Sequence, residues 1–121
     1  MGFTEPRFEL THDQPAPGTH VITVAGEIHV STAPRFSEEL NASIEDEAPA
    51  VVLDLSDVDF IDSTGLSVLL NGLRRVTRQR GRMVLVATNP TVLRLFEITR
   101  LDSTFDIRAT RAEALEAVGA A

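Results

Sequence analysis

Apolar and polar residues alternate or cluster in five short stretches of the chain, each typical of a β-strand. These stretches are residues 7–11, 20–28, 50–55, 83–87 and 105–107. A turn-rich segment with two prolines and a glycine, residues 12–19, separates the first two, so we expect them to pair as an antiparallel hairpin. The third stretch is apolar almost throughout, as a strand covered on both faces is, and we expect it at the centre of the sheet.

Apolar residues recur every three or four positions between these stretches, which predicts four helices. The first helix begins at a cap supplied by Ser31 or Thr32. The second is the longest, and Gly81 is expected to end it because glycine readily adopts a left-handed conformation. A third begins at Asn89, and a fourth covers about 112–118. The order β-β-α-β-α-β-α-β-α predicts an α/β fold with a mixed, mainly parallel sheet and an N-terminal antiparallel hairpin.

The composition is that of an ordinary globular chain, and a length of 121 residues predicts one domain over residues 1–121. The chain contains no cysteine, which excludes disulfides and thiolate metal sites and makes the cytoplasm the expected location. The first residues show no basic segment followed by an apolar one, and no apolar run approaches the length of a membrane span. We therefore expect neither export nor membrane insertion.

The formal net charge is −7, so nucleic-acid phosphates would be repelled and we expect no direct binding of nucleic acid. All 11 basic residues are arginines, and five of them fall within nine positions. These five are Arg74, Arg75, Arg78, Arg80 and Arg82. They form either a surface for an acidic partner or anion, or the solvated end of a helix whose dipole favours cations. We favour the second interpretation.

Candidate chemistry gathers in residues 56–65, which join the end of the central strand to the second helix. Ligand and regulatory sites of α/β sheets occur at such strand ends. Asp62, Ser63 and Thr64 are all suitable helix caps, and capping alone accounts for one or two of them. A phosphate on Ser63 would also be favoured by the helix dipole. It would add about −1.5 to −2 charges beside Asp57 and Asp59, and so would expel a partner that buries this position.

Other arrangements of reactive residues are weaker. Ser63 and Asp62 could form a hydrolase triad with His12, His20 or His29, but no G-x-S-x-G turn surrounds the serine, so we expect no enzymatic activity. The histidines lack metal-ligand spacing, and the aspartates of this segment lack the glycine and glutamate of a calcium loop. No lysine follows a glycine-rich turn, so no nucleotide-binding loop is predicted. We therefore expect neither a metal nor a cofactor.

The segments 52–55 and 58–66 resemble the signature of STAS-domain anti-sigma factor antagonists, in which aspartate and serine are followed by serine or threonine and then glycine. Residues 26–28 with Thr32 and Ala33 resemble the second strand and first-helix start of that family, and residues 89–96 resemble its third helix. The resemblance covers a core of about residues 8–118. It implies a STAS-type fold with about four helices.

The resemblance also implies partner switching. The unmodified antagonist would bind an anti-sigma factor that is an ATP-dependent serine kinase, and so release a sigma factor to RNA polymerase. Phosphorylation of Ser63 would end this complex, with Thr64 as a secondary acceptor, and a metal-dependent serine phosphatase would restore it. One departure is His29, where many members of the family carry an aspartate. His29 either lowers the efficiency of phosphorylation, or partly neutralises the phosphate, or is a solvated loop residue.

The docking surface expected from this resemblance combines the start of the second helix with the loop that follows the second strand. It consists of Asp62, Ser63, Thr64, Gly65, Ser67, Val68, His29, Ser31 and Thr32. An alternative is a STAS interaction module of a lipid-transport or other cytoplasmic assembly, in which the same surface docks without modification.

Overall fold

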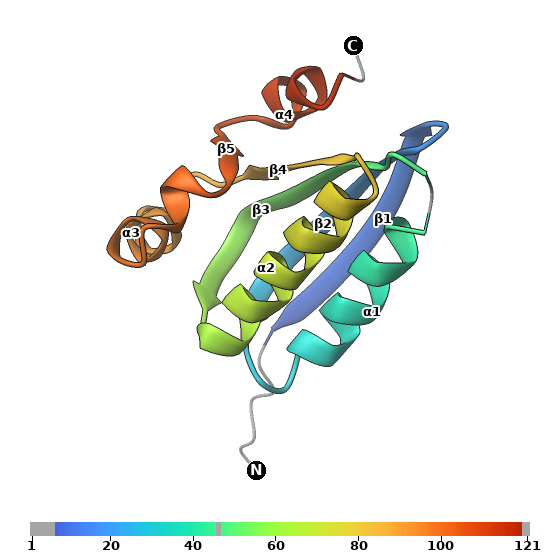
Figure 1. Cartoon of the computed structure of the whole chain (residues 1–121). Coiled ribbons are helices and arrows are strands. Elements are labelled where there is room, and N and C mark those ends of the chain that lie inside the picture. The colour runs from blue at the N-terminus through green and yellow to red at the C-terminus, as the bar shows by residue number, and fades with distance from the viewer. Residues whose placement is uncertain (1–6, 46, 120–121) are drawn as a thin grey trace.

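A five-stranded sheet forms the centre of the computed structural model, which describes residues 7–45 and 47–119 (Figure 1). The strands are β1 (Phe8–Ala16), β2 (Thr19–Ile28), β3 (Ala50–Ile61), β4 (Arg82–Val86) and β5 (Asp106–Arg108). They lie side by side in that order, with β1 antiparallel to β2 and the other pairs parallel. The predicted mixed sheet, its N-terminal hairpin and its central third strand are confirmed.

Helices cover both faces of this sheet. They are α1 (Ala33–Ser43), α2 (Ser63–Arg78), α3 (Pro90–Ile98) and α4 (Arg111–Ala117), with a short 3-10 helix at Leu101–Ser103. α1 and α2 pack on one face together with α3, while α4 packs on the other. The four predicted helices are thus present. Within the described ranges, no helix is long and apolar enough to cross a membrane.

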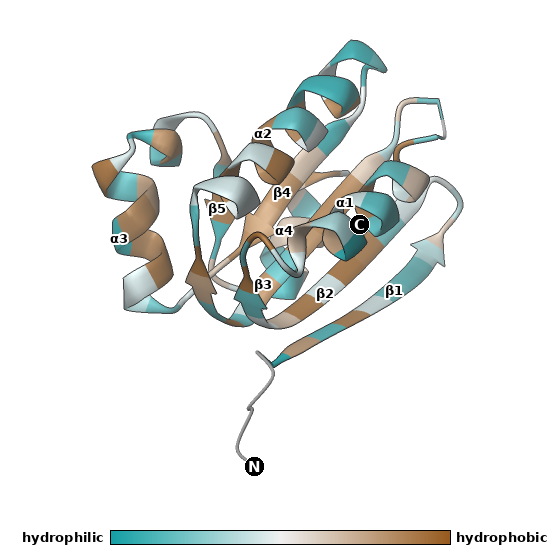
Figure 2. Ribbon diagram, turned by 90° about the horizontal axis from the view of Figure 1, so that it is seen from below, coloured by the Kyte–Doolittle hydropathy of each residue, from teal (hydrophilic) through white to brown (hydrophobic). Residues whose placement is uncertain are grey.

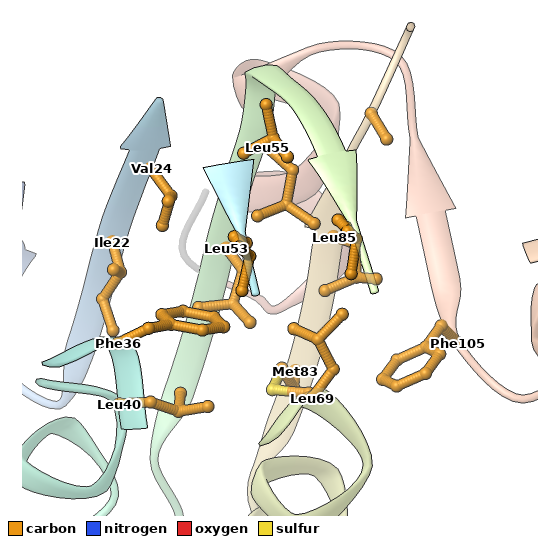
Figure 3. Close-up of a cluster of buried hydrophobic side chains, with 14 of the residues drawn as sticks. Ile22, Val24, Phe36, Leu40, Leu53, Leu55, Leu69, Met83, Leu85 and Phe105 are labelled. Carbon is orange, nitrogen blue, oxygen red and sulfur yellow. The ribbon is translucent and has the colours of Figure 1, made fainter. Parts of the chain in front are cut away.

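The main core lies between the sheet and the pair α1 and α2 (Figure 3). Phe36 and Leu40 of α1 and Leu69 of α2 point at the apolar side chains of β2, β3 and β4. Each fully buried side chain of this size contributes about 1.5–3 kcal/mol of transfer free energy. This packing fixes the direction of α2, and with it the position of the residues at the start of that helix.

Two strands are longer than the sequence pattern predicted. β1 continues through His12 and reaches Ala16, so the turn expected over 12–19 is reduced to Pro17 and Gly18. β3 does not end at Leu55 but continues to Ile61, paired with the last residues of β2. The β1 extension is mostly polar and exposed, and the β3 extension places Ser56, Asp57 and Asp59 among its apolar residues. A strand with one solvated side at the end of a buried run resembles a loop in sequence.

The prediction that Gly81 ends α2 by a left-handed conformation is wrong. That conformation is adopted by Arg80, with φ of 63°. Gly81 is needed for a different reason, since a Cβ atom there would lie 2.2 Å from the carbonyl oxygen of Pro49. The glycine therefore allows the turn after α2 to pass close to the segment that leads into β3.

Candidate functional site

Ser63 is the first residue of α2 and is exposed. Only Asp62 separates it from the end of β3, and the Asp62 N–H donates to Ile28 O at 3.1 Å. The start of α2 is thereby attached to the end of β2 as well as to β3. Ser63 thus lies at the carboxyl edge of two parallel strands, the location at which α/β sheets usually carry their sites.

Asp62 is the cap of α2. Its Oδ1 accepts a hydrogen bond from the Gly65 N–H at 3.0 Å, and its backbone is extended, as a cap requires. Of the three candidate caps, Ser63 and Thr64 are therefore left without that role. Neither hydroxyl makes a hydrogen bond to any residue that the structure describes. Ser63 is exposed, while Thr64 is half-buried.

Gly65 lets α2 approach the strands closely. A Cβ atom at this position would lie 2.8 Å from Cγ2 of Ile28 and 2.9 Å from Cγ2 of Ile61. It would also lie 3.0 Å from the Ile28 carbonyl oxygen, which cannot move without disturbing β2. Gly65 is buried, so it offers no surface to a partner. Its contribution to the predicted docking surface is to hold the start of α2, and with it Ser63, close to the strands.

The loop after β2 is held by Thr32, which the sequence placed at the surface and at the helix cap. Thr32 is buried, and its Oγ1 donates to Glu27 O at 2.7 Å while accepting from the His29 N–H at 3.0 Å. It occupies the position before α1 but makes no side-chain capping bond. The hydroxyl is used to close the loop, so it does not face a partner. Ser31, by contrast, is exposed.

His29 is part of the same closed loop. Its Nδ1 accepts from the Ser31 N–H at 3.1 Å, which leaves the ring proton on Nε2, 3.9 Å from Glu27 Oε1. Its ring also lies 6.4 Å from that of Phe60, centre to centre. With a side chain only 15% exposed, His29 is not a solvated loop histidine. The side chain orders the loop beside β3.

Two apolar residues that the sequence analysis passed over are exposed on the elements that meet at this end of the sheet. Val30 is 69% exposed in the loop after β2, and Phe60 is 45% exposed near the end of β3. The sequence held a signal for each exposed residue. Val30 is a single apolar residue between two polar ones after a strand, and Phe60 precedes Ile61 in a strand, so the two side chains point to opposite faces. Asp57 and Asp59 are exposed on the same strand, so the apolar pair lies in an acidic setting.

The other predicted surface residues lie on the first turns of α2. Ser67 is exposed, and its Oγ donates to Ser63 O at 3.0 Å. Val68 is half-buried and packs against the main core, so only part of its side chain is available. The surface at this end of the molecule therefore centres on Ser63 with Ser31, Ser67, Val30 and Phe60.

A hydrolase triad with His12 or His20 is ruled out by geometry. His20 lies at the start of β2 beside Val51, whereas Ile28 at the far end of β2 lies beside Ile61, so about 26 Å of strand separates them. His12 Nε2 is 2.8 Å from His20 Nδ1, and its other nitrogen is 3.0 Å from Glu39. Across the described ranges, no group of three or more histidine or acidic side chains is arranged to hold a metal.

Comparison with known proteins agrees with this geometry. Residues 12–114 match the family model of the STAS domain. The chain is 35% identical over 92 residues to the anti-sigma-B factor antagonist of Listeria monocytogenes serovar 1/2a, covering 76% of this chain and 81% of that protein. It is 32% identical over 101 residues to the anti-sigma-F factor antagonist RsfB of Mycobacterium tuberculosis, covering 84% and 82% respectively.

A solved structure gives the same result at the level of the fold. The crystal structure of an anti-sigma factor antagonist from Mycobacterium paratuberculosis superposes with a TM-score of 0.83 at 34% sequence identity. The match covers 93% of this chain and 95% of the other. The chain therefore belongs to the STAS-domain family, in its group of anti-sigma factor antagonists.

Proposed function

We propose that this chain binds an anti-sigma factor that is also an ATP-dependent serine kinase, and that phosphorylation of Ser63 ends the complex. Binding releases a sigma factor, and a metal-dependent serine phosphatase restores the unmodified chain. The chain is then a regulator and a kinase substrate, not an enzyme. The observation that carries the proposal is the exposed Ser63 hydroxyl at the first position of α2, free of hydrogen bonds to the described residues.

The start of α2 can accept a phosphate without local unfolding. The first N–H groups of a helix have no partner within the helix, and here Gly65 N and Leu66 N are bonded to Asp62. The N–H groups of Ser63 and Thr64 remain for the phosphate, and the helix dipole favours an anion there. The Asp62 carboxylate opposes this gain by like-charge repulsion, so we expect phosphorylation to change the stability of the fold little.

The same phosphate would prevent binding. Val30 in the loop after β2 and Phe60 near the end of β3 are exposed at the end of the sheet from which α2 begins, and they offer a partner apolar area to bury. A phosphate adds about −1.5 to −2 charges and a firmly held hydration shell at the start of α2, next to Asp62 and after the strand that carries Asp59. A loss of about 3 kcal/mol of binding free energy lowers the affinity about a hundredfold, which suffices for a switch.

Intact-mass measurement after incubation with the purified anti-sigma factor kinase and ATP tests the acceptor. We expect one added phosphate on the unchanged chain and on Ser67→Ala, and none on Ser63→Ala. Ser67 is the matched control because it is an exposed serine one turn further along the same helix. Labelling of Ser63→Ala as fast as of the unchanged chain would refute Ser63 as the acceptor, and slow labelling would indicate Thr64 as the secondary one.

The affinity of the kinase for Ser63→Glu and Ser67→Glu tests the switch itself. We expect the first substitution to weaken binding at least tenfold more than the second, since Ser63 directly follows the end of β3 that carries Phe60, whereas Ser67 lies one turn further along α2. Equal affinities would contradict the proposed interface. Capture of transporter subunits and no kinase from the native cell would instead favour the alternative of a STAS module that docks without modification.

His29 is proposed to tune this reaction through the order of its loop. A second ring proton on Nδ1 would displace the Ser31 N–H, so any neutralisation of the phosphate by His29 must first break that hydrogen bond. His29→Asp introduces the residue that many members of the family carry. We expect it to raise the initial rate of Ser63 phosphorylation severalfold, and an unchanged rate would remove His29 from the reaction.

A further inference from the structure

The five clustered arginines divide into two groups. Arg75 donates to Asn41 Oδ1 of α1, and Nη2 of Arg82 lies 3.4 Å from Oδ2 of Asp106, so these two connect neighbouring elements. The guanidinium groups of the other three are on exposed residues and make no hydrogen bond or ion pair to any residue in 7–45 or 47–119. These three, named the arginine surface, are Arg74, Arg78 and Arg80.

The arginine surface is continuous with Ser63 along one side of α2. Exposed residues recur there at helical spacing, namely Ser63, Ser67, Asn71, Arg74 and Arg78. At 1.5 Å per residue, Arg74 lies about 16 Å from Ser63 along the helix axis. A standard interface of about 800 Å² per partner is about 30 Å across, so a protein whose footprint lies along α2 can cover Ser63 at one edge and the arginines at the other. Figure 2 shows the last turns of α2 as hydrophilic.

The helix dipole explains one cation in the last turn of α2, but not three arginines without a carboxylate. The chain carries 18 acidic residues against 11 basic ones, yet none of those described forms an ion pair with these guanidinium groups. A single acidic residue on a neighbouring turn would be enough to form an ion pair with one of these arginines. Their charge is therefore left for a ligand outside the chain.

A protein carboxylate patch fits this surface better than a membrane or a nucleic acid. Binding to a lipid surface needs apolar side chains beside the basic ones, and the large exposed apolar residues among those described are Val30, Phe60 and Ile98, none of them in the last turns of α2. A polyanion as long as DNA would meet the acidic remainder of a chain with a net charge of −7. Planar guanidinium groups also match carboxylates in a bidentate manner.

We propose that the arginine surface binds an acidic patch on the same anti-sigma factor kinase that binds at Ser63, and this inference rests on the function proposed above. Because the chain carries a net charge of −7, an acidic patch is attracted most where arginines gather without carboxylate partners, as they do here. The contact steers association and fixes the orientation of the partner on α2, so it acts mainly on the association rate.

Phosphorylation leaves this contact intact. The 16 Å between Ser63 and Arg74 is about twice the screening length of roughly 8 Å at physiological salt. The phosphate therefore acts on dissociation near Ser63, while the arginines continue to attract the kinase. Steering by the arginine surface is thus the same for the modified and unmodified chain.

Association kinetics on the immobilised anti-sigma factor kinase, at about 50 mM and about 500 mM salt, test the inference. The double variant Arg74→Glu with Arg78→Glu should associate at least tenfold more slowly than the unchanged chain at low salt, with the difference shrinking at high salt. The matched control is Arg94→Glu with Arg100→Glu, which changes the net charge equally at two exposed arginines of α3 and the residues after it. We expect less than a threefold effect there.

Equal slowing by the two double variants would show a general charge effect and overturn the arginine surface, as would no slowing by either. If Arg74→Glu with Arg78→Glu lost binding to anionic vesicles but not to the kinase, the arginine surface would be a membrane-binding site and the proposed contact with the kinase would be wrong. Arg74→Gln with Arg78→Gln repeats the test without new negative charge at the end of α2, and slower association is expected again. If the unchanged chain binds no kinase, both the proposed function and this inference fail.

Discussion

Thr32 and Ser63 show two different uses of a hydroxyl at one end of the molecule. Thr32 is buried, and its hydroxyl bridges Glu27 O and the His29 N–H, which closes the loop after β2. Ser63 is exposed and its hydroxyl has no partner among the described residues, because Asp62 already caps the helix. Residue type and position in the motif do not separate the two roles. The two roles differ because the Thr32 hydroxyl lies within reach of a carbonyl and an amide of its own loop, whereas the cap of α2 is already supplied by Asp62.

Gly65→Ala should lower the free energy of unfolding by about 1–3 kcal/mol, the usual cost of overpacking. The added methyl group would contact Ile28 and Ile61 at 2.8 and 2.9 Å, and it would also meet the Ile28 carbonyl, so the start of α2 must move away from the strands. Urea unfolding measures the effect. Ser67→Ala, at an exposed position two residues further on, should change stability by less than about 0.5 kcal/mol. Equal midpoints for the two variants would mean that α2 is not held closely here.

At the scale of the elements, sequence pattern predicted order and pairing but not strand ends. Apolar runs such as 50–55 identify buried strands because both faces are covered. Beyond Leu55, β3 loses β4 as a neighbour, since that pairing ends at Asp54 with Val86. It continues against β2 alone, with polar side chains toward solvent, and such a segment has the composition of a loop. The sequence therefore predicted that Ser63 lies between the central strand and the second helix. It did not predict that β3 continues to Ile61, so that only Asp62 separates the strand from Ser63.

α4 is short, and it closes the second face of the sheet with Ala114 at the centre and Leu115, Ala117 and Val118 packed around it. Ala114 is fully buried against a cluster of valines, which are Val21, Val52, Val84 and Val86. Ala114→Asp would place an unpaired carboxylate in this cluster and should cost about 3–5 kcal/mol, as breaking a buried ion pair does. Ala112→Asp is the matched control, since Ala112 is exposed in the first turn, where an acidic residue suits the helix dipole. Urea midpoints that shift equally for both would show that α4 does not seal this face.

Over the whole molecule, the sequence predicted one end of the sheet as the site but not its chemical character. The aspartates and serines of the motif suggested a polar, anionic surface. The structure adds Val30 and Phe60, which become exposed because α1 and α2 cover the opposite side of the strands and loops that carry them. Likewise, the five clustered arginines looked alike in sequence, and only the folded chain separates Arg75 and Arg82 from those without partners. Which side chains pair across elements depends on tertiary structure, and no local pattern encodes it.

The pH dependence of global stability should carry a contribution from Asp106 at the edge of the sheet. Hydrogen bonds from Arg108, at 2.6 and 3.2 Å, lower the pKa of the Asp106 carboxyl, and Arg82 adds a weaker attraction. Since the folded-state pKa lies below the unfolded one, the stabilisation is complete above about pH 4 and is lost as the pH falls through the lowered value. Screening by solvent limits it to about 1 kcal/mol.

Urea midpoints at pH 7, 5 and 3 for the unchanged chain and Asp106→Asn measure this contribution. The unchanged chain should be more stable at pH 7 and 5, and the difference should shrink at pH 3 because the wild-type carboxyl then begins to protonate and loses its attraction for the two arginines. Glu97→Gln removes an exposed carboxylate of α3 that makes no ion pair within the described residues, so it controls for the change in net charge. A difference between the unchanged chain and Asp106→Asn that is the same at all three pH values would mean that Arg108 holds the aspartate by geometry alone, without favouring its charged form.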